Sequence, residues 1–373
     1  MENEQQQRTS DDSSIQGLTV NAFTYPTQTP ESDGTLEWCS TTLILVQLQG
    51  NGLTGLGYTY AHECCASLIR KTLFPIVKGR SPFAIPKLWQ EMNITVRNYG
   101  RSGIAACAIA AVDMALWDLR ARLEKLPLAK LLGKVRHEIP VYGSGGFTSY
   151  TRKQLQAQFA RWVAEGISTV KMKIGREPSR DAERVKWARD AIGTKTGLFV
   201  DANGAFSPKK AVEMAGQFSN FDVRWYEEPV TSDDLRGLAY VQEHAPATME
   251  IAAGEYNFEI DLARRMLEAR SVDVLQADAT RCGVTGFLKM ADLCTAFKIP
   301  LSAHTAPAVH AHLCCAAAPA VHVEYFHDHL RLEQLFFEGA TVKHKKGFLI
   351  PDSEPGLGLA FKQKAAAPFH VNI

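Results

Sequence analysis

The chain has 373 residues, of which 46% are hydrophobic and 22% charged, a composition typical of globular proteins. Its 41 basic and 40 acidic residues give a net charge of +1, which argues against nucleic acid or an anionic membrane surface as a partner. No apolar stretch reaches the length of a membrane span. The stretch at 42–48 is too short, and the stretch at 103–117 is interrupted by Asp113.

Residues 1–14 are polar and are predicted to form a disordered tail, since they lack the apolar centre of a secretory signal. The eight cysteines form no C-x-x-C pair and include two adjacent pairs. This pattern predicts free thiols in a reducing compartment, and a cytoplasmic location is therefore expected.

Residues 15–135 are predicted to form an α+β unit. Strands are expected at 41–49 and 54–60, joined by a tight turn at Gly50-Asn51-Gly52. The spacing of glycines here matches G-x-G-x-x-G, but a strand follows where a dinucleotide site needs a helix, so a hairpin is predicted. Helices are expected at 66–77, 86–93 and 104–123, and a long polar loop at 25–38, where long loops are often functional.

Residues 136–346 alternate short apolar strands with amphipathic helices. Such alternation predicts a parallel sheet, and eight repeats predict a closed (β/α) TIM barrel. The strands are expected at 140–142, 169–174, 198–201, 224–227, 251–254, 272–276, 300–302 and 321–324, with a helix after each of the first seven. Residues 347–373 are predicted to return to the N-terminal unit and to complete, with residues 15–135, a capping domain.

Ionisable residues stand where successive barrel strands are expected to end. They are Lys173, Asp201, Glu227, Glu255, Asp278, His304 and Glu324. Active sites of such barrels form at the C-terminal ends of the strands, and burial of so many ionisable groups without a use would be costly. The spacing therefore predicts one site that collects all seven.

Asp201, Glu227 and Glu255 belong to three consecutive strands. Three converging carboxylates repel one another unless a cation joins them, and this number of oxygen ligands suits Mg²⁺. One Mg²⁺ per chain is therefore predicted. Asn203 is a candidate for contact with metal or substrate, and Glu228 is expected to support the ligand Glu227.

Lys171 and Lys173 lie two positions apart, so a strand places them on one face. Taken alone, the pair could be the solvated face of an edge strand. Inside a barrel, repulsion and burial are expected to lower the pKa of one lysine, which could then act as a base. Asp278 is expected to hold one nitrogen of His304 and to make the other more basic.

A competing metal site could use His304, His310, His312, Cys314 and Cys315. The last four fall on a predicted Ala-rich helix, so they are interpreted as packing residues.

Together these motifs resemble the enolase superfamily, mandelate racemase subgroup, over nearly the whole chain. The resemblance rests on Lys171-Met172-Lys173, Asp201-Ala202-Asn203, Trp225-Tyr226-Glu227-Glu228-Pro229, Gly254-Glu255, Asp278, Ser302-Ala303-His304 and Val323-Glu324. The chain departs from the family at 281–285, where paired glycines are frequent. That departure is expected to alter the pocket wall without touching a catalytic role.

The resemblance implies Mg²⁺-dependent removal of the proton α to a carboxylate, with an enediolate intermediate. Lys173 would be the base on one face, tuned by Lys171, and His304 with Asp278 would act on the other face. Glu324 would hydrogen-bond the enediolate. A homo-oligomer, between dimer and octamer, is also implied.

Acid/base groups on both faces leave the overall reaction open. Dehydration of an acid sugar, an aldonate or aldarate, to a 2-keto-3-deoxy acid is predicted because the polar stretch 25–38 suits a polyhydroxylated substrate. Racemisation or epimerisation of a 2-hydroxy acid and cycloisomerisation are the alternatives, and a non-catalytic binding protein on this fold is another. Tyr25, Thr27 and Trp38 are predicted to contact the substrate.

Overall fold

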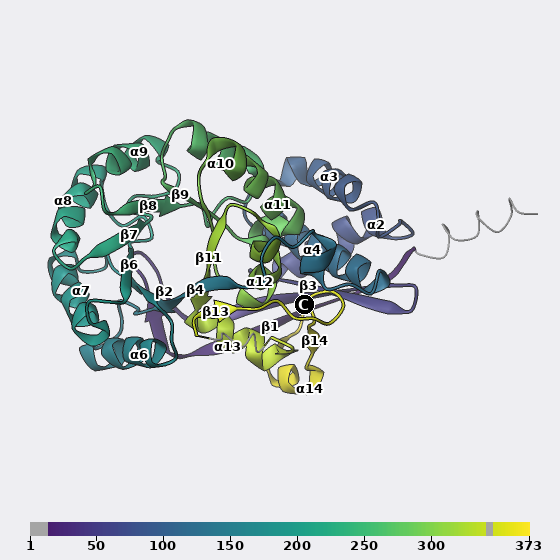
Figure 1. Ribbon diagram of the computed structural model, residues 1–373. Coiled ribbons are helices and arrows are strands. Elements are labelled where there is room, and N and C mark those ends of the chain that lie inside the picture. Colours follow the sequence, from purple (N-terminus) through teal and green to yellow (C-terminus); the bar gives the residue numbers. More distant parts are fainter. Residues whose placement is uncertain (1–13, 341–345) are drawn as a thin grey trace, which may run out of the picture.

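A computed structural model describes residues 14–340 and 346–373. The predicted tail therefore lies outside the described residues, apart from Ser14. The chain forms a closed barrel with a strand-rich unit beside it, and the barrel helices form an outer ring (Figure 1).

Eight parallel strands make the barrel. They are β4 (Ile139–Gly145), β5 (Thr169–Lys173), β6 (Gly197–Asp201), β7 (Val223–Glu227), β8 (Glu250–Ala253), β9 (Val274–Ala277), β10 (Leu301–Ala303) and β11 (Ala320–Phe326). Neighbours in sequence are neighbours in the sheet, and β11 pairs with β4 to close the ring. The predicted eight-stranded barrel is confirmed.

A helix follows every barrel strand. These helices are α6 (Arg152–Ala164), α7 (Pro178–Ile192), α8 (Pro208–Ser219), α9 (Leu235–His244), α10 (Ile260–Glu268), α11 (Ala279–Phe297), α12 (Pro307–Ala316) and α13 (His327–Phe336). The first seven were expected, whereas α13 was not. Leu332 and Phe336 of α13 are buried four positions apart, so the apolar side of this helix was present in the sequence but was not recognised.

Strand alternation decides which groups enter the barrel. On β5, Val170 and Met172 belong to the hydrophobic core, while Lys171 and Lys173 take the opposite face and are buried too. Phe199 and Trp225, two residues before Asp201 and Glu227, stack inside the barrel with ring centroids 5.0 Å apart. Aromatic rings therefore fill the barrel below the ionisable strand ends.

The second unit is an antiparallel sheet covered by helices. Its strands are β1 (Ile15–Ser32), β2 (Glu37–Gly50), β3 (Leu53–Tyr60) and β15 (His370–Val371), and its helical segments are α1 (Cys64–Leu68), η1 (Ile69–Leu73), α2 (Phe74–Val77), α3 (Ile85–Thr95), η2 (Val96–Tyr99), α4 (Ile104–Leu123) and α5 (Leu128–Leu131). Gly57 lets α4 approach β3 closely, because a Cβ there would lie 2.1 Å from the Ala111 carbonyl oxygen. Gly50 pairs with Leu53 across a hairpin, as predicted.

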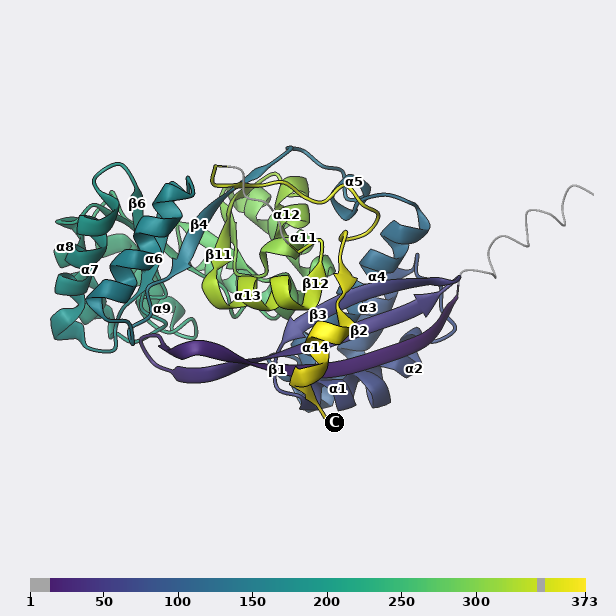
Figure 2. The same ribbon diagram turned by 90° about the horizontal axis from the view of Figure 1, so that it is seen from below.

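The predicted loop 25–38 is instead a long two-stranded ribbon. β1 and β2 remain paired to Ser32 and Glu37, with a register shift between Pro26 and Glu31. Proline-rich, polar residues made this segment resemble a loop, but the pairing of β1 with β2 continues through it. Figure 2 shows the ribbon leaving the sheet and reaching the barrel.

The C-terminal segment runs along both units. It contains β12 (Phe337–Glu338), β13 (Phe348–Leu349), β14 (Ala360–Phe361), α14 (Gln363–Ala366), η3 (Ala367–Phe369) and β15. β13 pairs with β4, and β15 adds an edge to β1. β4 is a barrel strand and β1 belongs to the second unit, so the segment contacts both. The division into a capping unit, 15–135 with 347–373, and a barrel, 136–346, stays a prediction. Among the helices of residues 14–340 and 346–373, none is long and apolar enough to cross a membrane.

Candidate active site

The structure gathers the seven predicted strand-end residues at one end of the barrel. All seven are buried, and the most exposed, His304, has 7% of its surface accessible. Lys171 joins them and is fully buried. Residues separated by more than 150 positions thus share one water-poor site.

Asp201, Glu227 and Glu255 form the centre of the site. One carboxylate oxygen from each lies within 4.8 Å of the other two. Glu255 reaches this place because β8 ends at Ala253 and Gly254 turns the chain with a φ of +130°. A side chain at 254 would strike the Gln276 carbonyl oxygen, since its Cβ would lie 2.4 Å away.

The two lysines contact these carboxylates. Lys173 Nζ lies 2.5 Å from Asp201 Oδ2, and Lys171 Nζ lies 3.3 Å from the same oxygen. Lys171 also pairs with Glu227 and lies 2.9 Å from Glu324 Oε1. Each ammonium group is therefore matched by buried negative charge.

The expectation of a lowered lysine pKa is wrong for this arrangement. Burial lowers the pKa of Lys173, but attraction to Asp201 outweighs it and the pKa is raised. The pKa of Lys171 is raised for the same kind of reason, with Glu227 and Glu324 opposing the effect of burial. The sequence revealed the two like charges, but it did not reveal how closely the carboxylates approach them.

The three carboxylates have the properties of a cation site. Burial and repulsion from Asp201 raise the pKa of Glu227 to about 8. The negative charge of the three carboxylates is therefore not fully balanced by the two lysines. Glu255 Oε2 is buried without a hydrogen-bond partner. Three buried carboxylates suit a hard divalent cation that would compete with the two ammonium groups.

His304 contacts the carboxylates at Glu255, whereas Lys173 contacts them at Asp201. Its Nδ1 lies 2.9 Å from Asp278 Oδ2, and its Nε2 lies 3.3 Å from Glu255 Oε2. Asp278 is held in turn by the Thr280 amide and hydroxyl, each 2.7 Å from Oδ1. Burial lowers the pKa of His304. The negative charges of Glu255 and Glu324 and the hydrogen bond that Asp278 accepts outweigh burial, so the pKa is raised. The predicted Asp–His pair is thus present, and its free nitrogen faces the carboxylates.

Arg281 is part of the site, although the departure at 281–285 was expected to leave catalytic residues untouched. It donates to the Glu255 carbonyl at 2.8 Å and pairs with Glu255 Oε1 at 3.3 Å. Its guanidinium lies over the Tyr256 ring, 4.5 Å from the centroid. The only sequence signal was an arginine three positions after Asp278, which was not informative without the geometry of α11.

Glu324 contacts the other residues of the site, whereas Glu228 is bonded to the loop beside it. Glu324 Oε2 accepts from the Thr305 amide at 3.1 Å and lies 3.6 Å from His304 Nε2. Glu228 is hydrogen-bonded to Ser232, and burial raises its pKa well above the ordinary value. Glu324 therefore faces the site, whereas Glu228 supports it from the adjoining loop.

The tip of the β1–β2 ribbon is fixed over the barrel end. A Cβ at Gly34 would lie 2.3 Å from the Ala202 carbonyl, so the tip touches the loop after β6. The Ser32 carbonyl accepts from the Thr148 amide at 2.8 Å, and the Asp33 carbonyl accepts from the Thr148 hydroxyl at 2.8 Å. The capping unit thus covers the site through contacts with loop 146–150.

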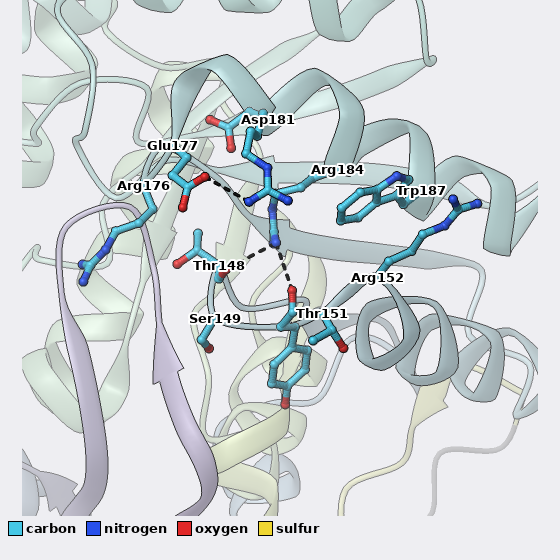
Figure 3. A pocket seen from close by; sticks show the side chains of 11 residues that line it. Thr148, Ser149, Thr151, Arg152, Arg176, Glu177, Asp181, Arg184 and Trp187 are labelled. Atoms are coloured by element: carbon cyan, nitrogen blue, oxygen red, sulfur yellow. Dashed lines mark hydrogen bonds and ion pairs between the residues drawn. The ribbon is translucent and has the colours of Figure 1, made fainter.

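Arg184 holds that loop from the other side. Its guanidinium, from α7, donates to the carbonyls of Gly146, Phe147, Thr148 and Tyr150 at 3.0–3.3 Å. Figure 3 shows Arg184 reaching towards Thr148. It forms part of an arginine-rich hollow of about 490 Å³. The other arginines there are engaged as well: Arg176 pairs with Glu37, Arg180 pairs with Glu177 and Arg152 lies over Trp187. The hollow is therefore interpreted as structural.

Replacement of Arg184 by Met should lower the free energy of unfolding by about 3 kcal/mol, because two buried and two half-buried carbonyls lose a charged donor. The matched control is Arg180→Met, which changes an exposed rim arginine of the same helix and should stay within about 0.5 kcal/mol of wild type. Urea unfolding measures both. Equal stabilities of the two variants would contradict the assigned role of Arg184.

The four residues predicted to contact substrate lie apart from one another. Tyr25 packs among Phe336, Phe369 and Arg331, away from the carboxylates. Thr27 lies in the irregular part of the ribbon. Trp38 faces Phe147 and lines a cavity beside β11. The backbone N–H of Asn203 donates to Asp201 Oδ1 at 3.0 Å, and the side-chain Oδ1 of Asn203 is buried without a hydrogen bond. A substrate role for any of them stays a proposal, and Trp38 and Asn203 are the best placed.

The competing histidine–cysteine site is not formed. His310 Nε2 accepts from the Ala279 amide, and His312 Nδ1 accepts from the Ala129 amide. The eight cysteines are free thiols, and Cys314 and Cys315 are buried on α12. Within the described ranges, the carboxylate trio is the single group of three or more potential ligands that lie close enough to hold an ion.

Comparison with known proteins gives matches over both units. A family described as "Mandelate racemase / muconate lactonizing enzyme, N-terminal domain" matches residues 20–133, and one described as "Enolase C-terminal domain-like" matches residues 154–365. The chain is 34% identical over 294 residues to a 3,6-anhydro-alpha-L-galactonate cycloisomerase of Streptomyces coelicolor, covering 77% of this chain and 80% of that protein. It is 30% identical over 330 residues to the L-talarate/galactarate dehydratase of Salmonella typhimurium, covering 87% and 81%.

Solved structures agree with these matches. A mandelate racemase/muconate lactonizing enzyme-like protein from Rubrobacter xylanophilus superposes with a TM-score of 0.93 at 47% identity, covering 96% of this chain and all of that one. A racemase from Streptomyces coelicolor with bound magnesium gives 0.89 at 29% identity, covering 96% and 100%. The fold and the site define a capped (β/α) barrel with a three-carboxylate centre. The chain belongs to the mandelate racemase/muconate lactonizing enzyme family of the enolase superfamily.

Proposed function

We propose that the protein is a Mg²⁺-dependent acid-sugar dehydratase, which removes the proton α to a carboxylate and then eliminates the β-hydroxyl. The observation that carries this proposal is that Lys173 and His304 contact different members of the buried trio of carboxylates, Asp201 and Glu255. Relatives named L-talarate/galactarate dehydratase, arabinonate dehydratase and D-gluconate dehydratase support the assignment.

Asp201, Glu227 and Glu255 would hold the Mg²⁺. The buried, incompletely paired carboxylates support this assignment, as does the magnesium in the related racemase structure. When bound, Mg²⁺ would supply positive charge to the substrate carboxylate, on which negative charge accumulates as the α-proton leaves.

The chain's own residues would move the protons. In its neutral amine form, which requires that the negative charge of Asp201 be offset, Lys173 Nζ would accept the α-proton, which breaks the C–H bond at C2 and leaves an enediolate. Lys171, held by Glu324, would keep a positive charge close to the substrate carboxylate. His304, protonated at Nε2 and oriented by Asp278, would give its proton to the β-hydroxyl, so that C3–O breaks and water leaves. The resulting enol becomes the 2-keto-3-deoxy acid when C3 is protonated.

Isomerisation is the second candidate. The relative named cycloisomerase is 34% identical to this chain, and the related magnesium structure is named a racemase. Both reactions could begin with the same proton transfer to Lys173. They differ from dehydration because the product keeps every atom of the substrate and no water is lost.

The test is incubation of the purified protein and Mg²⁺ with a library of aldonic and aldaric acids, followed by an assay for 2-keto acids. Dehydration predicts a keto product from at least one acid. Exchange of the α-proton with D₂O, or loss of optical rotation, without keto product would replace dehydration by isomerisation. Assembly into a homo-oligomer, from dimer to octamer, is a separate proposal that analytical ultracentrifugation tests.

A further inference from the structure

A cavity of about 380 Å³ adjoins the site on its capped side. We call it the distal cavity; the residues lining it include Trp38, Thr41, Tyr60, Phe326, Asp328 and His329. Phe326 is the last residue of β11 and follows Glu324 by two positions, so the cavity begins where β11 ends. The His329 ring stacks on the Tyr60 ring, with centroids 3.6 Å apart. Burial lowers the pKa of His329, and the positive charge of the nearby His304 lowers it further.

Buried polar atoms around the distal cavity lack partners. They are the Tyr60 hydroxyl and His329 Nδ1 in its wall, and Oε2 of Glu31, which pairs across the ribbon with the lining residue Trp38. A buried polar group without a hydrogen bond costs about 1–3 kcal/mol, and such groups are rare in folded proteins. Several around one cavity indicate a ligand that brings hydrogen-bonding groups of its own.

The cavity offers no cation to a ligand. Of the described residues that line it, none is Lys or Arg. Arg331 lies nearby, but it pairs with Asp328 at 3.2 Å and donates to the Pro26 carbonyl at 3.3 Å. His62 is at the exposed rim and pairs with Glu63 at 3.7 Å.

Acidic residues give the cavity its charge instead. Asp328 is buried and also accepts a hydrogen bond from the Thr41 hydroxyl. Glu31 is buried behind Trp38, and burial with repulsion from Asp328 raises its pKa to about 8, so at pH 7 it is mainly a neutral hydrogen-bonding group. Hydroxyl groups can bond to all of these residues, whereas a second carboxylate would compete with Asp328 for the one guanidinium beside it, that of Arg331.

We infer that the substrate is a monocarboxylic polyhydroxy acid of the aldonate type, with its hydroxylated end in the distal cavity. A dicarboxylic aldarate would place its second carboxylate against Asp328. The inference rests on the proposed function, because it assumes that the first carboxylate occupies the trio of metal ligands. It narrows the substrate from acid sugars in general to those with one carboxylate.

The experiment compares pairs of acids that share stereochemistry and differ only at the far end, such as D-gluconate with D-glucarate and D-galactonate with galactarate. The full-length protein is assayed with Mg²⁺ for 2-keto acid and for α-proton exchange in D₂O. For at least one pair, kcat/KM for the aldonate should exceed that for the aldarate by about 100-fold. Asp328→Asn should narrow this ratio by about 10-fold, whereas the matched control Glu63→Gln at the exposed rim should leave it unchanged.

The outcomes separate the two proposals. Equal or faster turnover of the aldarates overturns the inference and leaves the proposed function intact. Absence of both keto acid and exchange with every acid overturns the proposed function, and the inference with it. The wild-type comparison decides the matter even if Asp328→Asn fails to fold.

Discussion

Replacement of Lys173 by Met is expected to lower kcat/KM by about 10³-fold while Mg²⁺ binding persists. A positioned general base contributes roughly 10²–10⁴-fold to a rate, and Met preserves most of the buried volume. The trio of carboxylates keeps Lys171 as a counter-ion, because Lys171 Nζ lies 3.3 Å from Asp201 Oδ2. The variant should therefore fold, bind the ion and lose proton transfer from one face.

Lys186→Met is the matched control, since Lys186 lies on the surface of α7 and pairs only with Asp190 there. Calorimetry measures Mg²⁺ binding, and NMR in D₂O measures α-proton exchange. Loss of Mg²⁺ binding in Lys173→Met would contradict the separation of base from metal ligands. Unchanged exchange would remove Lys173 from the proton transfer.

Asp201→Asn should abolish stabilisation by Mg²⁺ and reduce turnover below detection. Asp201 contacts both lysines, so the substitution leaves two buried ammonium groups with less negative charge. Removing one partner of a buried ion pair costs about 3–5 kcal/mol of stability. The metal-free Asp201→Asn protein should therefore unfold at a lower temperature than the metal-free wild type. In the wild type, bound Mg²⁺ should raise Tm, because ligands that bind only the folded state stabilise it.

Thermal unfolding with and without Mg²⁺ measures both effects. Asp190→Asn changes an exposed aspartate of an ordinary surface pair and should behave as wild type. A Tm that still rises with Mg²⁺ in Asp201→Asn would exclude Asp201 as an essential ligand. A variant as stable as wild type without the ion would contradict the role given to the lysine contacts.

The barrel and its ionisable ring could be predicted because both depend on periodicity. Strand alternation puts Lys171 with Lys173, and Phe199 with Asp201, on the inner face, and the regular β/α repeat brings the strand ends together. The trio Asp201, Glu227 and Glu255 follows from this spacing alone. The sequence did not reveal which charges meet most closely, so the effect of Asp201 on the pKa of Lys173 was missed.

The capping side was harder to predict because it depends on contacts between distant segments. The ribbon at 25–38 contains prolines and polar residues, yet its strands pair through to Ser32 and its tip rests on Thr148. Arg281 reaches Glu255 only because α11 begins directly after Asp278. No local pattern marks Asp328 and His329 on α13 as the wall of a cavity.

Deuterium incorporation during turnover tests the central claim most directly. The wild-type protein, Mg²⁺ and an aldonate are incubated in D₂O, and the product is analysed by NMR. The proposed mechanism predicts a 2-keto-3-deoxy acid with one deuterium at C3, and no product after Mg²⁺ is removed with a chelator. A product without deuterium, or turnover that persists without Mg²⁺, would contradict it.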